Sequence, residues 1–177
     1  MKKETLKKVL LGLSLVALLS LSPVLAQVTK QVTFQVNLLE WYDLSLDKTA
    51  LTFSDIAPSY VSNPSTRSIS ANEGPLSVTV FAIVIPTAQV RLTVTAQGDL
   101  TAGSYTIPAS NISWTGTGSG FASSGSLQNG TAVGVGSWSG SVFYYVTGQM
   151  NFSFLRDYIN QVPGNYSLTA TFTLSKV

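Results

Sequence analysis

Histidine, cysteine and paired carboxylates are the side chains that most often carry catalysis near neutral pH. This sequence of 177 residues contains no histidine and no cysteine, so its carboxylates are the main candidates. A glycosidase would need two of them at a fixed separation. Those beyond residue 26 are Glu40, Asp43, Asp47, Asp55, Glu73, Asp99 and Asp157. Four have turn-like neighbours, where aspartate typically bonds its own backbone: Asp43, Asp47, Asp55 and Asp99. We therefore expect a protein that is not an enzyme.

Metal or cofactor binding is not indicated either. Zinc, copper and haem sites usually rely on histidine or cysteine ligands, which this sequence lacks. Asp43 and Asp47 offer loop oxygens for a weak Ca²⁺ site, but no EF-hand-like series of ligands accompanies them. The sequence predicts no metal and no cofactor.

Aromatic side chains are the remaining candidates for a binding surface. Trp41, Tyr42 and Trp114 flank predicted loops, where exposed rings can stack on sugar rings. Most aromatic residues within strands belong to the core, and Trp138 and the run Phe143–Tyr145 fit that description. The sequence leaves a ligand-facing role open for the first three residues.

The first 26 residues have the pattern of a secretory signal peptide. Lysines precede the apolar run Val9–Leu21, and Val24-Leu25-Ala26 suits a signal peptidase. The run is shorter than the ~20 residues that a membrane-spanning helix needs, which favours cleavage over a retained anchor. We expect a mature chain of residues 27–177 that is secreted or displayed at the cell surface and has no membrane span.

Cleavage changes the charge balance of the chain. Four of the ten basic residues and one of the eight acidic residues precede Gln27, which leaves six basic and seven acidic residues. Such a chain has no basic patch to hold a phosphate backbone, so we expect no nucleic-acid partner.

Short β-strands separated by glycine and proline account for most of the mature sequence. In Tyr166–Leu174 and Gln89–Ala96, apolar residues alternate with polar, mostly hydroxyl-bearing ones. Leu76–Ile85 is mostly apolar and predicts a strand buried on both faces. The spacing predicts one domain, residues 27–177, in which two antiparallel sheets pack as an all-β sandwich.

Other segments predict irregular structure. Thr115–Gly130 is rich in glycine, serine and threonine and predicts a flexible loop, whereas Leu155–Val162 predicts a helical turn. Tyr166 follows Pro163-Gly164-Asn165, which is typical of a corner tyrosine whose hydroxyl bonds nearby backbone. Four asparagines match the N-glycosylation pattern: Asn111, Asn129, Asn151 and Asn165.

The first mature segment, Val28–Leu38, also predicts a strand, with two possible uses. Its alternation is interrupted only by Lys30. The strand can complete its own sandwich, or it can reach into the open edge of a neighbouring copy and make the same kinds of contact there. Residues 27–38 are therefore a possible donor strand, with copies of the chain as the expected partner. The apolar residues that would face a core are Val28, Val32, Phe34, Val36 and Leu38.

Four stretches of the chain resemble secreted β-sandwich surface proteins of bacteria and archaea, and they look similar to fimbrial subunits of the spore-coat-U type. The stretches are Leu44–Pro58, Val90–Leu100, Ile107–Trp114 and Pro163–Leu174. The resemblance implies an immunoglobulin-like sandwich at the cell surface, built into a filament, although the cysteine pair of many fimbrial subunits is missing.

The leading hypothesis is a non-enzymatic extracellular structural subunit of a filament or pilus, assembled by β-strand donation. Two alternatives remain: a secreted carbohydrate- or protein-binding module, which needs its loop aromatics exposed together, and a small outer-membrane β-barrel, which needs an outward apolar band.

Overall fold

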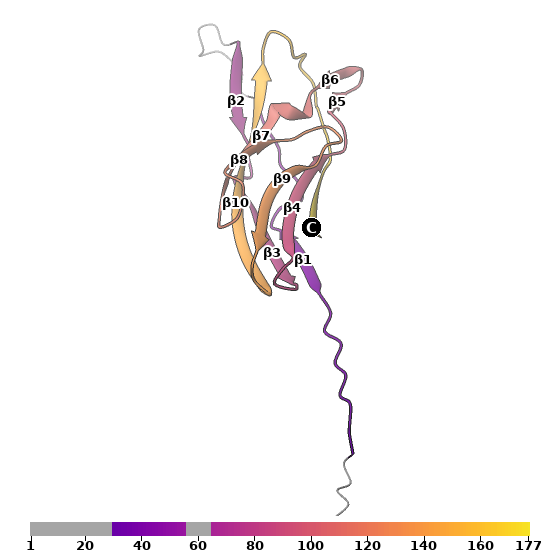
Figure 1. Ribbon diagram of the computed structural model, residues 1–177. Coiled ribbons are helices and arrows are strands. Elements are labelled where there is room, and N and C mark those ends of the chain that lie inside the picture. Colours follow the sequence, from indigo (N-terminus) through magenta and orange to yellow (C-terminus); the bar gives the residue numbers. More distant parts are fainter. Residues whose placement is uncertain (1–29, 56–64) are drawn as a thin grey trace, which may run out of the picture. The chain divides into compact units, whose positions relative to one another are not determined.

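The computed structural model describes residues 30–55 and 65–177 (Figure 1). The predicted signal peptide and Val28 lie outside these residues. The chain divides into two units, Met1–Asn37 and Leu38–Val177, and all strands of the described residues belong to the second. Within the described ranges, no helix is long and apolar enough to cross a membrane.

The larger sheet, sheet A, has six strands, and all its pairings are antiparallel. Its path runs β1–β3–β10–β7–β8, and β2 also pairs with β10. The long strand β10 organises this sheet, because β3 and β2 pair along one edge in succession while β7 pairs along the other. The strands are β1 (Trp41–Leu46), β2 (Thr66–Ser70), β3 (Leu76–Ile83), β7 (Ile112–Thr117), β8 (Ser124–Ser126) and β10 (Phe143–Asp157).

The second sheet, sheet B, has three antiparallel strands in the order β11–β4–β9. They are β4 (Gln89–Ala96), β9 (Val133–Ser139) and β11 (Ala170–Lys176), with a shift of register between Leu92 and Thr93. A small hairpin of β5 (Leu100–Ala102) and β6 (Tyr105–Ile107) follows β4, and a single 3₁₀ turn covers Ala109–Asn111.

The core lies between the two sheets, as strand alternation requires. From β3, Val78, Val80 and Ala82 are buried, and from β4 the predicted inward residues are buried as well: Val90, Leu92, Val94 and Ala96. The prediction of an all-β sandwich built from two antiparallel sheets is therefore confirmed. Residues 76–85, however, are not buried on both faces: Ile83 and Ile85 are exposed because no described layer covers the outer face of sheet A.

Three local predictions need correction. The helical turn predicted at residues 155–162 is shorter than expected: β10 continues to Asp157, where its backbone pairs with β2, and one turn follows at residues 158–160, closed by the Gln161 amide donating to the Asp157 carbonyl at 3.1 Å. The predicted loop at 115–130 contains β8 and the buried Leu127, which forms part of the core. The last strand begins at Ala170 rather than Tyr166. The corner tyrosine itself is confirmed, since the Tyr166 hydroxyl donates to the Val162 carbonyl at 2.9 Å.

Candidate assembly site

The N-terminal arm, residues 30–40, is the most exposed apolar part of the described chain. It forms no strand, so the strand predicted over residues 28–38 is absent from its described part. Its four apolar residues of even number are between 73 and 90% exposed: Val32, Phe34, Val36 and Leu38. An extended segment becomes a strand only when it pairs with another edge. The residues of this arm that were predicted to face a core, from Val32 to Leu38, are therefore exposed to solvent.

The same even-numbered pattern continues from the arm into β1. There, Tyr42, Leu44 and Leu46 point inward and pack against the core, while Trp41, Asp43 and Ser45 point outward and are exposed. Successive strand residues alternate between faces. An extended chain from residue 32 to residue 46 would thus carry one apolar face, interrupted only at Glu40.

The open flank of the sandwich is the side where β1, the edge of sheet A, lies beside β11, the edge of sheet B (Figure 1). Among the described residues, no backbone hydrogen bond joins these two strands. The inward side chains on both strands are only half-buried, although they pack on the core: Tyr42, Leu44, Leu46, Ala170, Phe172 and Leu174. This flank therefore combines two free strand edges with incompletely covered apolar side chains.

One end of the open flank is held by an ion pair. The Lys176 ammonium donates to the Glu40 carboxylate at 2.7 Å, and Glu40 also accepts from the Tyr42 hydroxyl at 3.2 Å and the Ile85 amide at 3.4 Å. The hydrogen bond from Lys176 lowers the pKa of Glu40, and the same bond raises the pKa of Lys176. The pair thus ties the start of β1 to the end of β11.

The structure separates the three predicted ligand-facing aromatic residues. Trp41 is exposed on the outer face of sheet A, and Tyr42 is half-buried with its ring against the core. Trp114 is 2% exposed, so its prediction as a ligand-facing residue is wrong: as an inward residue of β7, it fills the core.

The prediction that residues 143–145 belong to the core also needs correction. Only Tyr144 is buried there, whereas Phe143 and Tyr145 are exposed on the outer face of sheet A, one strand away from Trp41 across β3. The outward orientation of Phe143 and Tyr145 could have been predicted from the sequence, because residues on either side of a buried strand residue face outward. Trp138 belongs to the core as predicted.

Most of the carboxylates make contacts that stabilise loops and strand ends. Glu73 accepts from the Thr52 amide and hydroxyl, and Asp99 accepts from the Ala109 amide. Asp157 accepts from the amides of Ile159 and Asn160, and the bond from the Asn160 side chain lowers the pKa of Asp157.

The two aspartates considered for calcium occupy different settings. Asp47 accepts from the Ser77 amide at 2.7 Å, and its contact with Lys48 lowers the pKa of Asp47. Asp43 lies within β1, so the turn predicted around it is wrong: its backbone pairs opposite Phe81 of β3. Across residues 30–55 and 65–177, no group of three acidic residues is placed to hold a metal ion.

The four predicted glycosylation asparagines differ in accessibility. Asn129 and Asn165 lie in exposed connections, and Asn151 is exposed on β10. The Asn111 side-chain amide donates to the Leu155 carbonyl at 2.9 Å, so its nitrogen is already engaged.

Comparison of the chain with protein-family models and with curated proteins found no match. The resemblance to fimbrial subunits thus remains an interpretation of strand and turn patterns.

Proposed function

We propose that this protein is an exported, non-enzymatic structural subunit that polymerises at the cell surface by β-strand donation. The predicted donor strand of one copy, residues 28–38, inserts between β1 and β11 of the next copy. The observation that carries the proposal is that one chain has both an exposed arm with alternating apolar residues and an open flank of half-buried apolar residues.

The spacing of apolar side chains in an extended arm would match their spacing along the open flank. Alternate residues of a strand are about 6.8 Å apart on one face, which is the spacing of both Phe34–Val36 on the arm and Phe172–Leu174 on β11. Insertion would supply backbone partners to free strand edges and cover apolar side chains on both sides. Burying each exposed valine, leucine or phenylalanine of the arm contributes about 1.5–3 kcal/mol before ordering costs.

The connection between arm and β1 favours insertion into another copy. Folding the arm back beside its own β1 would require a tight turn at residues 38–40. Those residues are Leu38, Leu39 and Glu40, and none is the glycine, asparagine, aspartate or proline that tight turns prefer. The chain is better suited to continue in an extended form away from its own β1.

The test compares two aspartate substitutions on the arm of the mature chain. Phe34→Asp places a charge on the apolar face of the arm and should abolish oligomers that resist heating in detergent. Gln35→Asp places the same charge on the polar face and should leave them intact. Oligomer size is measured by sedimentation and by gel electrophoresis without boiling.

A peptide experiment isolates the donor contact. A synthetic peptide of residues 28–38 should raise the melting temperature of the Phe34→Asp protein, whose open flank is free. Strand donation is wrong if the unmodified mature protein stays monomeric across concentration and the peptide neither binds nor stabilises the variant.

A further inference from the structure

The outer face of sheet A carries an exposed aromatic platform that strand donation does not use. It consists of Trp41 on β1, Phe81 and Ile83 on β3, and Phe143 and Tyr145 on β10. Strand pairing aligns these residues in two rows: Trp41, Ile83 and Phe143 form one row, and Asp43, Phe81 and Tyr145 form the next. Trp41, Phe143 and Tyr145 are between 55 and 67% exposed. The rings of Phe81 and Phe143 meet edge to face at 5.5 Å.

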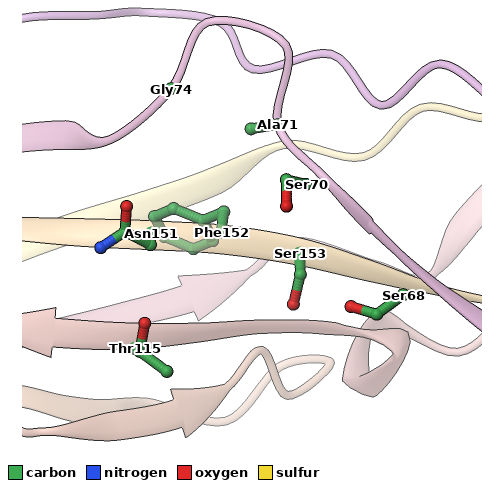
Figure 2. Close-up of a pocket in the computed structure, with 8 residues that line it drawn as sticks. All are labelled: Ser68, Ser70, Ala71, Gly74, Thr115, Asn151, Phe152 and Ser153. Atoms are coloured by element: carbon green, nitrogen blue, oxygen red, sulfur yellow. The ribbon is translucent and has the colours of Figure 1, made fainter.

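Beyond these two rows, the same face changes to hydroxyl and amide groups. Ser45, Thr79 and Thr147 form the third row, with the two threonine hydroxyls 3.2 Å apart. Further along β10 the face reaches a hollow of about 290 Å³ (Figure 2). Figure 2 shows Ser70 of β2 beside Ser153 of β10 in its lining, with Asn151 on the far side of Phe152. From Phe143 to Ser153, this face of β10 extends over roughly 34 Å.

The charge on this face restricts what it can bind. Asp43 is the only charged side chain among the outward residues of β1, β3 and the part of β10 from Phe143 to Ser153. No hydrogen-bond donor to the Asp43 carboxylate occurs within the described chain. The face therefore offers apolar rings, one free acceptor carboxylate and many hydroxyls, without a cation that would hold a polyanion.

The apolar part of this face has the size of a functional patch. Aromatic side chains bury about 150–250 Å² each when fully covered, so the exposed parts of Trp41, Phe143 and Tyr145 amount to roughly 300–450 Å². An apolar patch of this size is typical of functional surfaces on monomeric proteins.

We propose that this face binds an extended, neutral polysaccharide. The C–H faces of its sugar rings stack on Trp41, Phe143 and Tyr145, and its hydroxyls donate to Asp43 and exchange hydrogen bonds with the polar row and the hollow. A linear, hydroxyl-rich chain fits a face that is about 34 Å long and apolar at one end and polar at the other. The site is independent of the arm and the open flank, because its residues point away from the core.

Tryptophan fluorescence gives a direct readout of this site. Trp41 is exposed while Trp114 and Trp138 are buried, so a ligand on the platform should change the emission of Trp41 alone. The probes are cellohexaose and chitohexaose, titrated into the mature protein. The Phe34→Asp protein is titrated in parallel, so that the result does not depend on polymerisation.

The expected result is saturable binding of at least one of these neutral oligosaccharides, weakened about tenfold by Tyr145→Ala. Tyr105→Ala, which removes another exposed tyrosine from β6, should leave binding unchanged. Failure of both oligosaccharides to change emission overturns the proposal, as does equal weakening by both substitutions. Self-association of the Phe34→Asp protein that Tyr145→Ala abolishes would instead assign the face to contacts between copies.

Discussion

The two flanks of this sandwich are built differently. The closed flank lies between β8 of sheet A and β9 of sheet B, where backbone hydrogen bonds link residues 118–123 to β9. The Ala122 amide donates to the Val135 carbonyl at 2.7 Å, and the Ser137 amide donates to the Gly120 carbonyl at 2.9 Å. At the open flank, among the described residues, β1 and β11 share no such bond.

Side-chain packing follows the same division. On the closed flank, the ring of Trp138 lies against Gly120 and Gly136, and the ring of Trp114 lies so close to Gly125 that a Cβ at any of these glycines would overlap a ring. Phe121 packs edge to face on Trp138 at 5.1 Å. On the open flank, the inward residues stay half-buried.

The difference indicates where the fold can accept another strand. Proteins usually protect free edges with charges, prolines, bulges or covering loops, because such edges pair with other chains. Here residues 118–123 provide that cover on one flank, while within residues 30–55 and 65–177 the other flank has only the Glu40–Lys176 pair at one end. The contrast supports strand donation at the open flank.

The largest effect on stability is expected at the closed flank. Trp114→Ala should lower the free energy of unfolding by about 3–5 kcal/mol, because it opens a cavity in the packed core. Trp114→Phe should cost less: among the described residues the buried indole N–H has no acceptor, so removing it sacrifices no hydrogen bond. Urea unfolding of both variants in the Phe34→Asp background measures the difference, and equal losses would contradict this view of the Trp114 ring.

A substitution at the open flank should have an effect that depends on assembly. In the monomeric Phe34→Asp background, Phe172→Ala should cost about 1–2 kcal/mol, since Phe172 is only half-buried. In the protein with an intact arm, the same substitution should also reduce the yield of heat-resistant oligomers, because the donated strand would cover Phe172.

Thr173→Ala on the exposed face of β11 is the matched control and should stay within about 0.5 kcal/mol of the parent in both backgrounds. Sedimentation and urea unfolding are measured for each variant. A cost for Phe172→Ala as large as that for Trp114→Ala would show that the two flanks are equally closed.

Much of the core of this fold follows from the sequence alone. The alternation in residues 89–96 predicted the buried residues of β4 correctly, and turn residues predicted the corner at Tyr166. These signals are local, since they depend on neighbours along one strand.

The missed features depend on partners far away in sequence. The composition of residues 115–130 suggested a loop, yet Gly120 and Gly125 are needed there because Trp138 and Trp114 lie against them. The turn predicted at 155–162 begins only after Asp157, because β10 pairs up to that residue with β2, more than 80 residues earlier in the chain. The sequence leaves a ligand-facing role open for Trp114 because it cannot tell which face of β7 meets sheet B. The aromatic platform became visible only when register aligned Trp41, Ile83 and Phe143.

The smallest expected effect concerns the ion pair at the end of the open flank. Because the pKa of Glu40 is lowered in the folded protein, the pair stabilises the fold above the ordinary pKa of glutamate, 4.5, and this contribution is lost as the pH falls through the lowered value. The raised pKa of Lys176 means that its contribution is present below 10.5 and is lost as the pH rises through the raised value. Glu40→Gln should therefore lower the melting temperature slightly between about pH 5 and pH 10, and the difference from the parent should shrink in stronger acid.

Melting temperatures across this range, with Glu73→Gln as a control for an acid that bonds Thr52 instead of a lysine, test the assignment. Added salt should reduce the effect of Glu40→Gln more than that of Glu73→Gln, because only the former removes an exposed ion pair. An effect of Glu40→Gln that is the same at pH 3 and pH 7 would show that Glu40 contributes through its shape and not through its charge.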